Sequence, residues 1–314
     1  MTTQLFSTTL VPGIQVNDEK LDRIQAPVLP SQAFHFQADA HDGITIEPYS
    51  PAVGGRVKGL RIESDTTLPP ATLAFINASL LKYGFLSFEP GTVAPEHFDK
   101  LVGIFGTPKL MNTPYTPETG KDGQLNAIDS SIKKTRMNYI WHIDQVFQHQ
   151  QPRYTALFGQ KMPQQGGGTL FTNATLAIQL LDPKLVEYLE TLTAIHDVEA
   201  QGFLTCAYHD QEMRTQERLK APPIEVPLIR VHPETGRKQI FANELYTLRI
   251  LGLTRRASES LLNILFDALT SPDVQALHNW QDGTALIWDN RTVQHRGVPN
   301  FGDQRRVLHR ALVL

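Results

Sequence analysis

The chain has 314 residues, of which 41% are hydrophobic and 19% are charged, a composition typical of a globular protein with a sizeable core. Its formal net charge of −3 gives no indication of a nucleic acid or an anionic membrane as a partner. The single cysteine, Cys206, cannot form a disulfide within the chain, which favours a reducing, cytoplasmic compartment. We expect Cys206 to be a buried thiol rather than a nucleophile. The chain shows neither a secretory signal in Met1–Leu10 nor an apolar stretch of the roughly 18 residues that a membrane helix needs.

The pattern of elements predicts a β-rich domain preceded by an arm. Residues 1–45 show scattered prolines without periodicity and are expected to form an extended N-terminal arm, and residues 46–314 are expected to form one domain. Prolines 69 and 70 begin a predicted helix that Gly84 ends. Further helices are predicted after Pro95 and over 183–192 and 258–269, and strands over 85–88, 138–142, 154–159, 169–172, 226–231, 239–242, 284–288 and 307–314. Many short strands with helices between them are typical of a β sandwich or barrel.

One short motif carries the chemical signal. His142 and Asp144 follow Trp141 at a spacing of two, and His295 lies far downstream. Two imidazoles and one carboxylate form the facial triad that binds non-haem Fe(II) and leaves open positions on the metal. If residues 138–142 continue as a strand through the motif, the side chains of His142 and Asp144 leave the same face. The pair alone is a weak signal, because the chain has 11 histidines.

Two arginines follow His295 on the last predicted strand. Arg306 and Arg310 are four residues apart, so their side chains share a face, while Arg305 is expected to point outward. An arginine inside a β barrel is costly unless it meets an anion, ideally a carboxylate. The glycine run 166–168 is not a phosphate-binding loop, because it lacks the lysine and the following helix.

Taken together, these segments resemble the TauD/TfdA family of Fe(II)/2-oxoglutarate-dependent dioxygenases. The resemblance covers about residues 45–314 and implies a mainly β fold with helical insertions around a double-stranded β-helix core, a jelly roll of the cupin type. The matching segments, in the order of the family, are Trp141–Asp144, Gly166–Leu170, Phe241–Glu244, Ile287–Arg291, His295, Arg305–Arg306 and Arg310.

The resemblance implies particular functions for single residues. His142, Asp144 and His295 match the iron ligands, and Thr169 and Arg306 match the residues that hold the distal carboxylate of 2-oxoglutarate. Arg310, Asn138 and Tyr246 match substrate-pocket positions, with Arg310 facing an anionic group. The implied enzyme uses Fe(II), 2-oxoglutarate and O2, releases succinate and CO2, and hydroxylates a small, anionic organic substrate, with cleavage of a C–S or C–O bond where the carbon bears such a group. A homo-oligomer, dimer or tetramer, is expected, without nucleic-acid or membrane partners.

Some positions depart from the family, and some alternatives stay open. Met111 stands where the taurine enzymes have a substrate-binding histidine, and residues 198–203 diverge, which indicates a less polar pocket than taurine needs. Asp144 argues against halogenation, because related halogenases have a small residue there. The alternative activities are desaturation or cyclisation of a biosynthetic intermediate or amino acid, and a zinc hydrolase, which would have no use for Thr169 and Arg306. A catalytically silent binding protein would be expected to lack one of the metal ligands.

Overall fold

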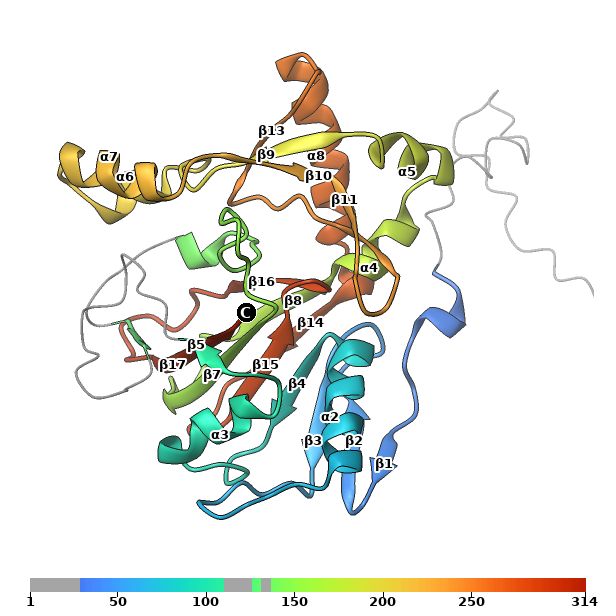
Figure 1. The fold of residues 1–314 in the computed structure, drawn as a ribbon, viewed down its shortest axis with the longest axis vertical. Helices are drawn as coiled ribbons and strands as arrows, with labels where there is room; N and C mark the ends of the chain where they lie inside the picture. Colours follow the sequence, from blue (N-terminus) through green and yellow to red (C-terminus); the bar gives the residue numbers. More distant parts are fainter. Residues whose placement is uncertain (1–28, 110–125, 131–136) are drawn as a thin grey trace, which may run out of the picture.

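Two facing β-sheets form the centre of the molecule (Figure 1). The computed structural model describes residues 29–109, 126–130 and 137–314. All strand pairs of the larger, nine-stranded sheet are antiparallel except β3 with β4. Its order is β1 (Asp39–His41), β2 (Ile44–Pro48), β3 (Gly55–Lys58), β4 (Phe85–Phe88), β15 (Ala285–Asp289), β7 (Tyr154–Lys161), β17 (Val307–Val313) and β5 (Pro108–Lys109), with β6 (Asn126–Asp129) also paired to β17.

The smaller sheet lies against the larger one and carries part of the candidate site. Its order is β14 (Gln275–His278), β8 (Thr169–Asn173) and β16 (Val293–Gly297). Phe171 of β8 stacks on Phe85 of β4 with ring centroids 4.5 Å apart, and it also contacts the ring of Trp288 on β15. These buried aromatic side chains join the two sheets into one apolar core. The predicted jelly-roll core is therefore confirmed.

Helices cover the outer face of the larger sheet. α2 (Pro70–Tyr83) and α3 (Phe98–Gly103), which follows the 3-10 helix η2 (Pro95–His97), share a second apolar cluster with this sheet. As predicted, α2 begins at the prolines and ends at Gly84, whose φ of +79° suits glycine and whose N–H donates to the carbonyl of Leu80.

A third layer packs beside the smaller sheet and contains the largest apolar cluster. It contains a three-stranded sheet, a hairpin and most of the remaining helices (Figure 1). They are α4 (Ala174–Ala177), η4 (Ile178–Leu180), α5 (Pro183–Leu189), β9 (Thr193–His196), α6 (Phe203–Ala207), α7 (Gln211–Lys220), β10 (Ile224–Pro227), β11 (Ile229–Val231), β12 (Lys238–Ile240), β13 (Thr247–Ile250), α8 (Arg255–Leu269) and η5 (Pro272–Val274). The predicted helix over 258–269 is α8, which Thr254 caps by accepting from the N–H of Ala257.

Three expectations from the sequence were wrong. The single strand predicted over 226–231 is divided between β10 and β11, which belong to different sheets because the chain changes partner at Leu228. No strand runs through residues 138–142: the 3-10 helix η3 (Met137–Tyr139) precedes His142, which forms one isolated bridge with His295, and a turn follows. The apolar side chains after Asp144 mimic a strand because the turn itself is buried in the third layer, where Val146 and Phe147 pack. Cys206 is exposed on α6 rather than buried, because the short helix directs it away from that layer's core.

The N-terminal arm lies mostly outside the described residues. The described part contains η1 (Ser31–Ala33) and then β1, which pairs with β2, so the proposed boundary between arm and domain at residue 45 stays a prediction. Within the described ranges, none of the helices has the length and apolar character needed to cross a membrane.

The core predicts where stability is concentrated. Phe158 is buried on β7 and packs against Phe98 with ring centroids 5.6 Å apart. Phe158→Ala should lower the free energy of unfolding by about 3–5 kcal/mol, measured by urea denaturation. The control Phe36→Ala, at a side chain 68% exposed, should change it by less than about 0.5 kcal/mol. Equal losses would contradict this description of the core.

Candidate metal centre

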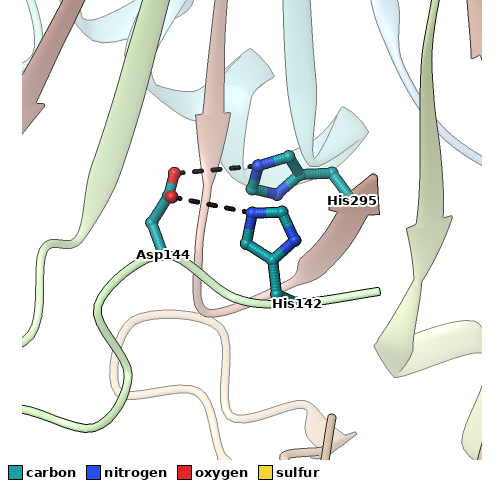
Figure 2. Close-up of side chains that lie close together, drawn as sticks. All are labelled: His142, Asp144 and His295. Carbon is teal, nitrogen blue, oxygen red and sulfur yellow. Dashed lines mark ion pairs between the residues drawn. The ribbon is translucent and has the colours of Figure 1, made fainter. Parts of the chain in front are cut away.

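Three potential metal ligands converge from two distant parts of the chain. The bridge between the backbones of His142 and His295 consists of two hydrogen bonds of 3.0 Å, and it places the two imidazoles side by side. Asp144 reaches the same point from the turn (Figure 2). Its Oδ1 lies 3.9 Å from Nε2 of His142 and its Oδ2 lies 3.8 Å from Nε2 of His295. All three residues are buried, and their ligand atoms lie within 4.8 Å of one another.

The hydrogen bonds leave the relevant nitrogen of His142 available. Nδ1 of His142 lies 2.7 Å from the carbonyl oxygen of Ile140, which can only accept, so Nδ1 carries the proton and Nε2 keeps its lone pair. Two ligand atoms that are each about 2.0–2.2 Å from one ion can be at most about 4.4 Å apart. The separations of 3.8 and 3.9 Å, each measured to a different oxygen of Asp144, lie below this upper limit.

Burial and mutual charge keep the three groups in the protonation states that bind metal. Burial lowers the pKa of His295 to about 3, with further contributions from His142 and Arg310. Burial also lowers the pKa of His142. Burial alone would raise the pKa of Asp144, but His295, His142, Arg310 and the hydroxyl of Thr155 together hold it below its usual value. Neutral imidazoles beside an ionised carboxylate are the forms that coordinate a cation.

Arg306 lies against the glycine turn that leads into β8. Its Nε donates to the carbonyl oxygen of Gly167 at 2.9 Å. Within this turn, a Cβ on Gly166 would lie 2.2 Å from the carbonyl oxygen of Asn300. Only glycine therefore allows the backbone at residue 166 to lie so close to the backbone of Asn300. Burial lowers the pKa of Arg306 to about 10, so the guanidinium stays charged at neutral pH. Among the described residues no carboxylate pairs with it, whereas Arg305 is exposed and pairs with Asp129.

Thr169 presents a hydroxyl proton that no group in the described part of the chain accepts. Its Oγ1 accepts a hydrogen bond of 2.9 Å from the indole Nε1 of Trp280, which is only a donor, so the hydroxyl proton of Thr169 remains for another group. Strand pairing places Thr169 opposite Gly297, two residues beyond His295 on β16. The hydroxyl of Thr169 and the imidazole of His295 thus belong to neighbouring strands of the smaller sheet.

Arg310 and Tyr246 lie within electrostatic reach of the triad. The charge of Arg310 on β17 lowers the pKa of His142, Asp144 and His295. Burial raises the pKa of Tyr246, and the charge of Asp144 raises it further. The ring of Tyr246 lies 4.8 Å from that of Phe147 and 6.0 Å from that of Phe203, measured between centroids.

The remaining predicted pocket positions are less informative. Asn138 is exposed on η3. Met111 lies outside the described residues, and Val198 is buried in the cluster that contains Phe147 and Phe203. Reasoning from the sequence assigned no function to Thr155, which donates to Oδ2 of Asp144 at 2.7 Å, or to Trp280. Neither belongs to a recognisable motif, because each is brought to the site only by contacts between segments far apart in the sequence.

Comparison with known proteins agrees with this geometry. The family described as "Taurine catabolism dioxygenase TauD, TfdA family" matches residues 45–312. An alkylsulfatase of Acinetobacter baylyi is 31% identical over 265 residues, which are 82% of this chain and 81% of the relative. The (S)-phenoxypropionate/alpha-ketoglutarate-dioxygenase of Sphingobium herbicidovorans is 28% identical over 270 residues, covering 84% of this chain and 92% of the relative.

A solved structure supports the similarity of fold. The crystal structure of a taurine dioxygenase from Burkholderia xenovorans superposes with a TM-score of 0.71 at 26% sequence identity. The match covers 87% of this chain and 91% of the other.

A histidine beside the site predicts a pH dependence of stability. His278, paired with Thr169 across β14 and β8, is buried with both ring nitrogens unpartnered among the described residues. Burial, with the charges of Arg56 and Arg306, lowers its pKa to about 3. Below pH 6.5 the unfolded chain therefore binds a proton that the folded chain does not, so stability falls as the pH falls.

Substitution of His278 tests this prediction. Between pH 8 and pH 5 the wild-type protein should lose about 2 kcal/mol more stability than His278→Leu, measured by urea denaturation at each pH. An identical loss in the two proteins would show that His278 does not stay neutral in the folded state.

Proposed function

Because the chain belongs to the TauD/TfdA family of Fe(II)/2-oxoglutarate-dependent dioxygenases, we propose that His142, Asp144 and His295 bind the iron on which its activity depends. The enzyme oxidises a C–H bond of a small organic substrate with O2 and releases succinate and CO2 from 2-oxoglutarate. The observation that carries the assignment of the ligands is their convergence within 4.8 Å in a buried site. Three protein ligands leave positions for a keto acid and for O2 on an octahedral ion.

Thr169 and Arg306 are the proposed anchors of 2-oxoglutarate. Arg306 is a partly buried cation without a carboxylate partner among the described residues, and Thr169 offers a hydroxyl proton. A carboxylate between them would offset the cost of burying the guanidinium and would accept charge-assisted hydrogen bonds. A zinc hydrolase would need neither group, so this pair favours the dioxygenase chemistry over that alternative.

The substrate is proposed to combine an anionic group with an apolar body. Arg310 supplies positive charge close to the triad, and Tyr246, Phe147 and Phe203 supply an aromatic surface near Asp144. An alkyl sulfate and a phenoxypropionate, the compounds in the names of two relatives, both have these two parts. Hydroxylation of a carbon attached to sulfur or oxygen would be followed by cleavage of that bond. Asn138 is proposed as a further, weaker contact at the rim.

The cytoplasmic location and the homo-oligomeric state stay predictions. They rest on the single cysteine and on the resemblance to the family, respectively. Gel filtration with light scattering would measure the oligomeric state directly.

His142→Ala tests the proposed iron site. Loss of one ligand should lower 2-oxoglutarate-dependent oxygen uptake by at least about 100-fold, because even groups that only orient metal ligands contribute 10- to 100-fold. Oxygen uptake and succinate release would be measured against a panel of alkyl sulfates, sulfonates and aryloxyalkanoates. His149→Ala, at an exposed histidine, is the control and should keep full activity. Coupled turnover by His142→Ala would refute the proposal.

Arg306→Ala tests the proposed anchor of the co-substrate. Loss of a charge-assisted contact should raise the KM for 2-oxoglutarate by about 10- to 100-fold. Arg306→Lys should recover part of this loss, because lysine keeps the charge but not the fork of donors. Arg305→Ala, which removes the neighbouring exposed guanidinium, should leave the KM within about twofold. If both alanine variants had the same KM, the co-substrate would bind elsewhere.

A further inference from the structure

A chain of buried hydrogen bonds ends on Asp144, and its direction is fixed by chemistry. The indole Nε1 of Trp288 donates to Oδ1 of Asn290 at 3.0 Å, Nδ2 of Asn290 donates to Oγ1 of Thr155 at 2.9 Å, and the hydroxyl of Thr155 donates to Oδ2 of Asp144 at 2.7 Å. All four side chains are buried.

Each hydrogen bond in this series determines which group donates in the next one. An indole nitrogen can only donate, so the amide oxygen of Asn290 must face Trp288 and the amide nitrogen must face Thr155. The amide nitrogen in turn can only donate, so the single proton of the Thr155 hydroxyl is left for Asp144. A second donation from Nδ2 of Asn290, to the carbonyl oxygen of Pro152 at 3.3 Å, supports the same orientation of the amide.

Strand pairing explains why these residues meet. Thr155 on β7 lies directly opposite Trp288 on β15, so both side chains project from the same face of the larger sheet. The ring of Trp288 also packs against the imidazole of His295, with centroids 4.6 Å apart. Trp288 therefore contacts one proposed ligand directly and reaches a second one through Asn290 and Thr155.

We propose that Thr155 and Asn290 are positioning residues that fix the orientation of Asp144 before the metal binds. This inference rests on the proposed iron site. A carboxylate held by a donor of fixed direction has one preferred rotamer, so less conformational freedom is lost when the cation arrives. Without the Thr155 hydroxyl, Oδ2 of Asp144 would lose the only hydrogen bond that the described residues give it.

Binding of Mn(II) to the metal-free protein tests the inference without reference to turnover. The dissociation constant would be measured from the electron paramagnetic resonance signal of free Mn(II). Thr155→Val keeps the shape of the side chain but removes its proton, and it should weaken binding by about 10- to 100-fold. Thr155→Ser restores the hydroxyl and should bind within about twofold of the wild type.

Thr172→Val is the matched control. Thr172 is also fully buried, and its hydroxyl donates to the carbonyl oxygen of Leu269 at 2.6 Å, away from the triad. Thr155→Val loses two buried hydrogen bonds and Thr172→Val loses one, so the thermal midpoints of both metal-free forms should fall, with the larger fall for Thr155→Val. Only Thr155→Val should also lose affinity for Mn(II). Affinity within twofold of the wild type for Thr155→Val, or an equal loss for Thr172→Val, would overturn the inference.

Asn290→Asp tests the direction of the hydrogen bonds between Trp288 and Asp144, and it leaves Thr155 unchanged. An acceptor in place of the amide nitrogen would draw the Thr155 proton away from Asp144, so binding of Mn(II) should weaken by at least about 10-fold. The same substitution in the Thr155→Val background should add little, because the link that it acts through is already absent. Unchanged affinity in Asn290→Asp, or additive losses in the double variant, would overturn the inference.

His142→Ala separates the two hypotheses. If it binds Mn(II) as the wild type does, the proposed metal site itself is wrong. If it fails to bind while Thr155→Val binds normally, only the positioning function of Thr155 and Asn290 is wrong.

Discussion

A buried, ionised carboxylate is the constraint on which the rest of the site depends. Asp144 is 7% exposed, and burial of its charge would be costly without compensation. The compensation comes from the charge of Arg310 and the hydroxyl of Thr155. A divalent cation between the carboxylate and the two imidazoles would offset the remaining cost. The burial that makes the charge of Asp144 costly thus also favours the binding of a cation at this site.

The fold brings these groups together by pairing distant segments. The turn after His142 has no regular structure of its own, and Gln145 within it has a φ of +48°, which is rare for a residue other than glycine. The turn is held by the bridge to His295 on β16 and by the hydrogen bond from Thr155 on β7. Since β16 and β7 belong to the two facing sheets, the triad lies at their junction. Strain at Gln145 is tolerated because both sheets fix the turn.

Sequence reasoning recovered the elements whose pattern is local. Residues 70–83 and 258–269 have helical periodicity, with prolines or a capping threonine at one end, and both form helices. Residues 154–159 and 307–313 form strands as predicted, because their apolar residues cover a face of the core. His142, Asp144 and His295 were found through ligand chemistry and the resemblance to the family, and the structure brings them together.

The features that could not be predicted from the sequence depend on pairing between segments far apart in the chain. The buried turn after His142 has the apolar composition of a strand, so only its contacts with His295 and with the third layer distinguish the two. Thr155 and Trp288 are 133 residues apart in the sequence, and they lie opposite each other only because β7 and β15 pair. The exposure of Cys206 likewise follows from the path of α6, which its neighbours in sequence do not specify.

The most direct test of the central claim is an anaerobic visible spectrum of the wild-type protein with Fe(II), recorded before and after addition of 2-oxoglutarate. The proposed site predicts a weak charge-transfer band that appears only when protein, Fe(II) and the keto acid are present together. Such a band requires the keto acid to bind the iron itself, beside the three protein ligands. A spectrum that 2-oxoglutarate leaves unchanged, with Fe(II) shown to be bound, would contradict the account.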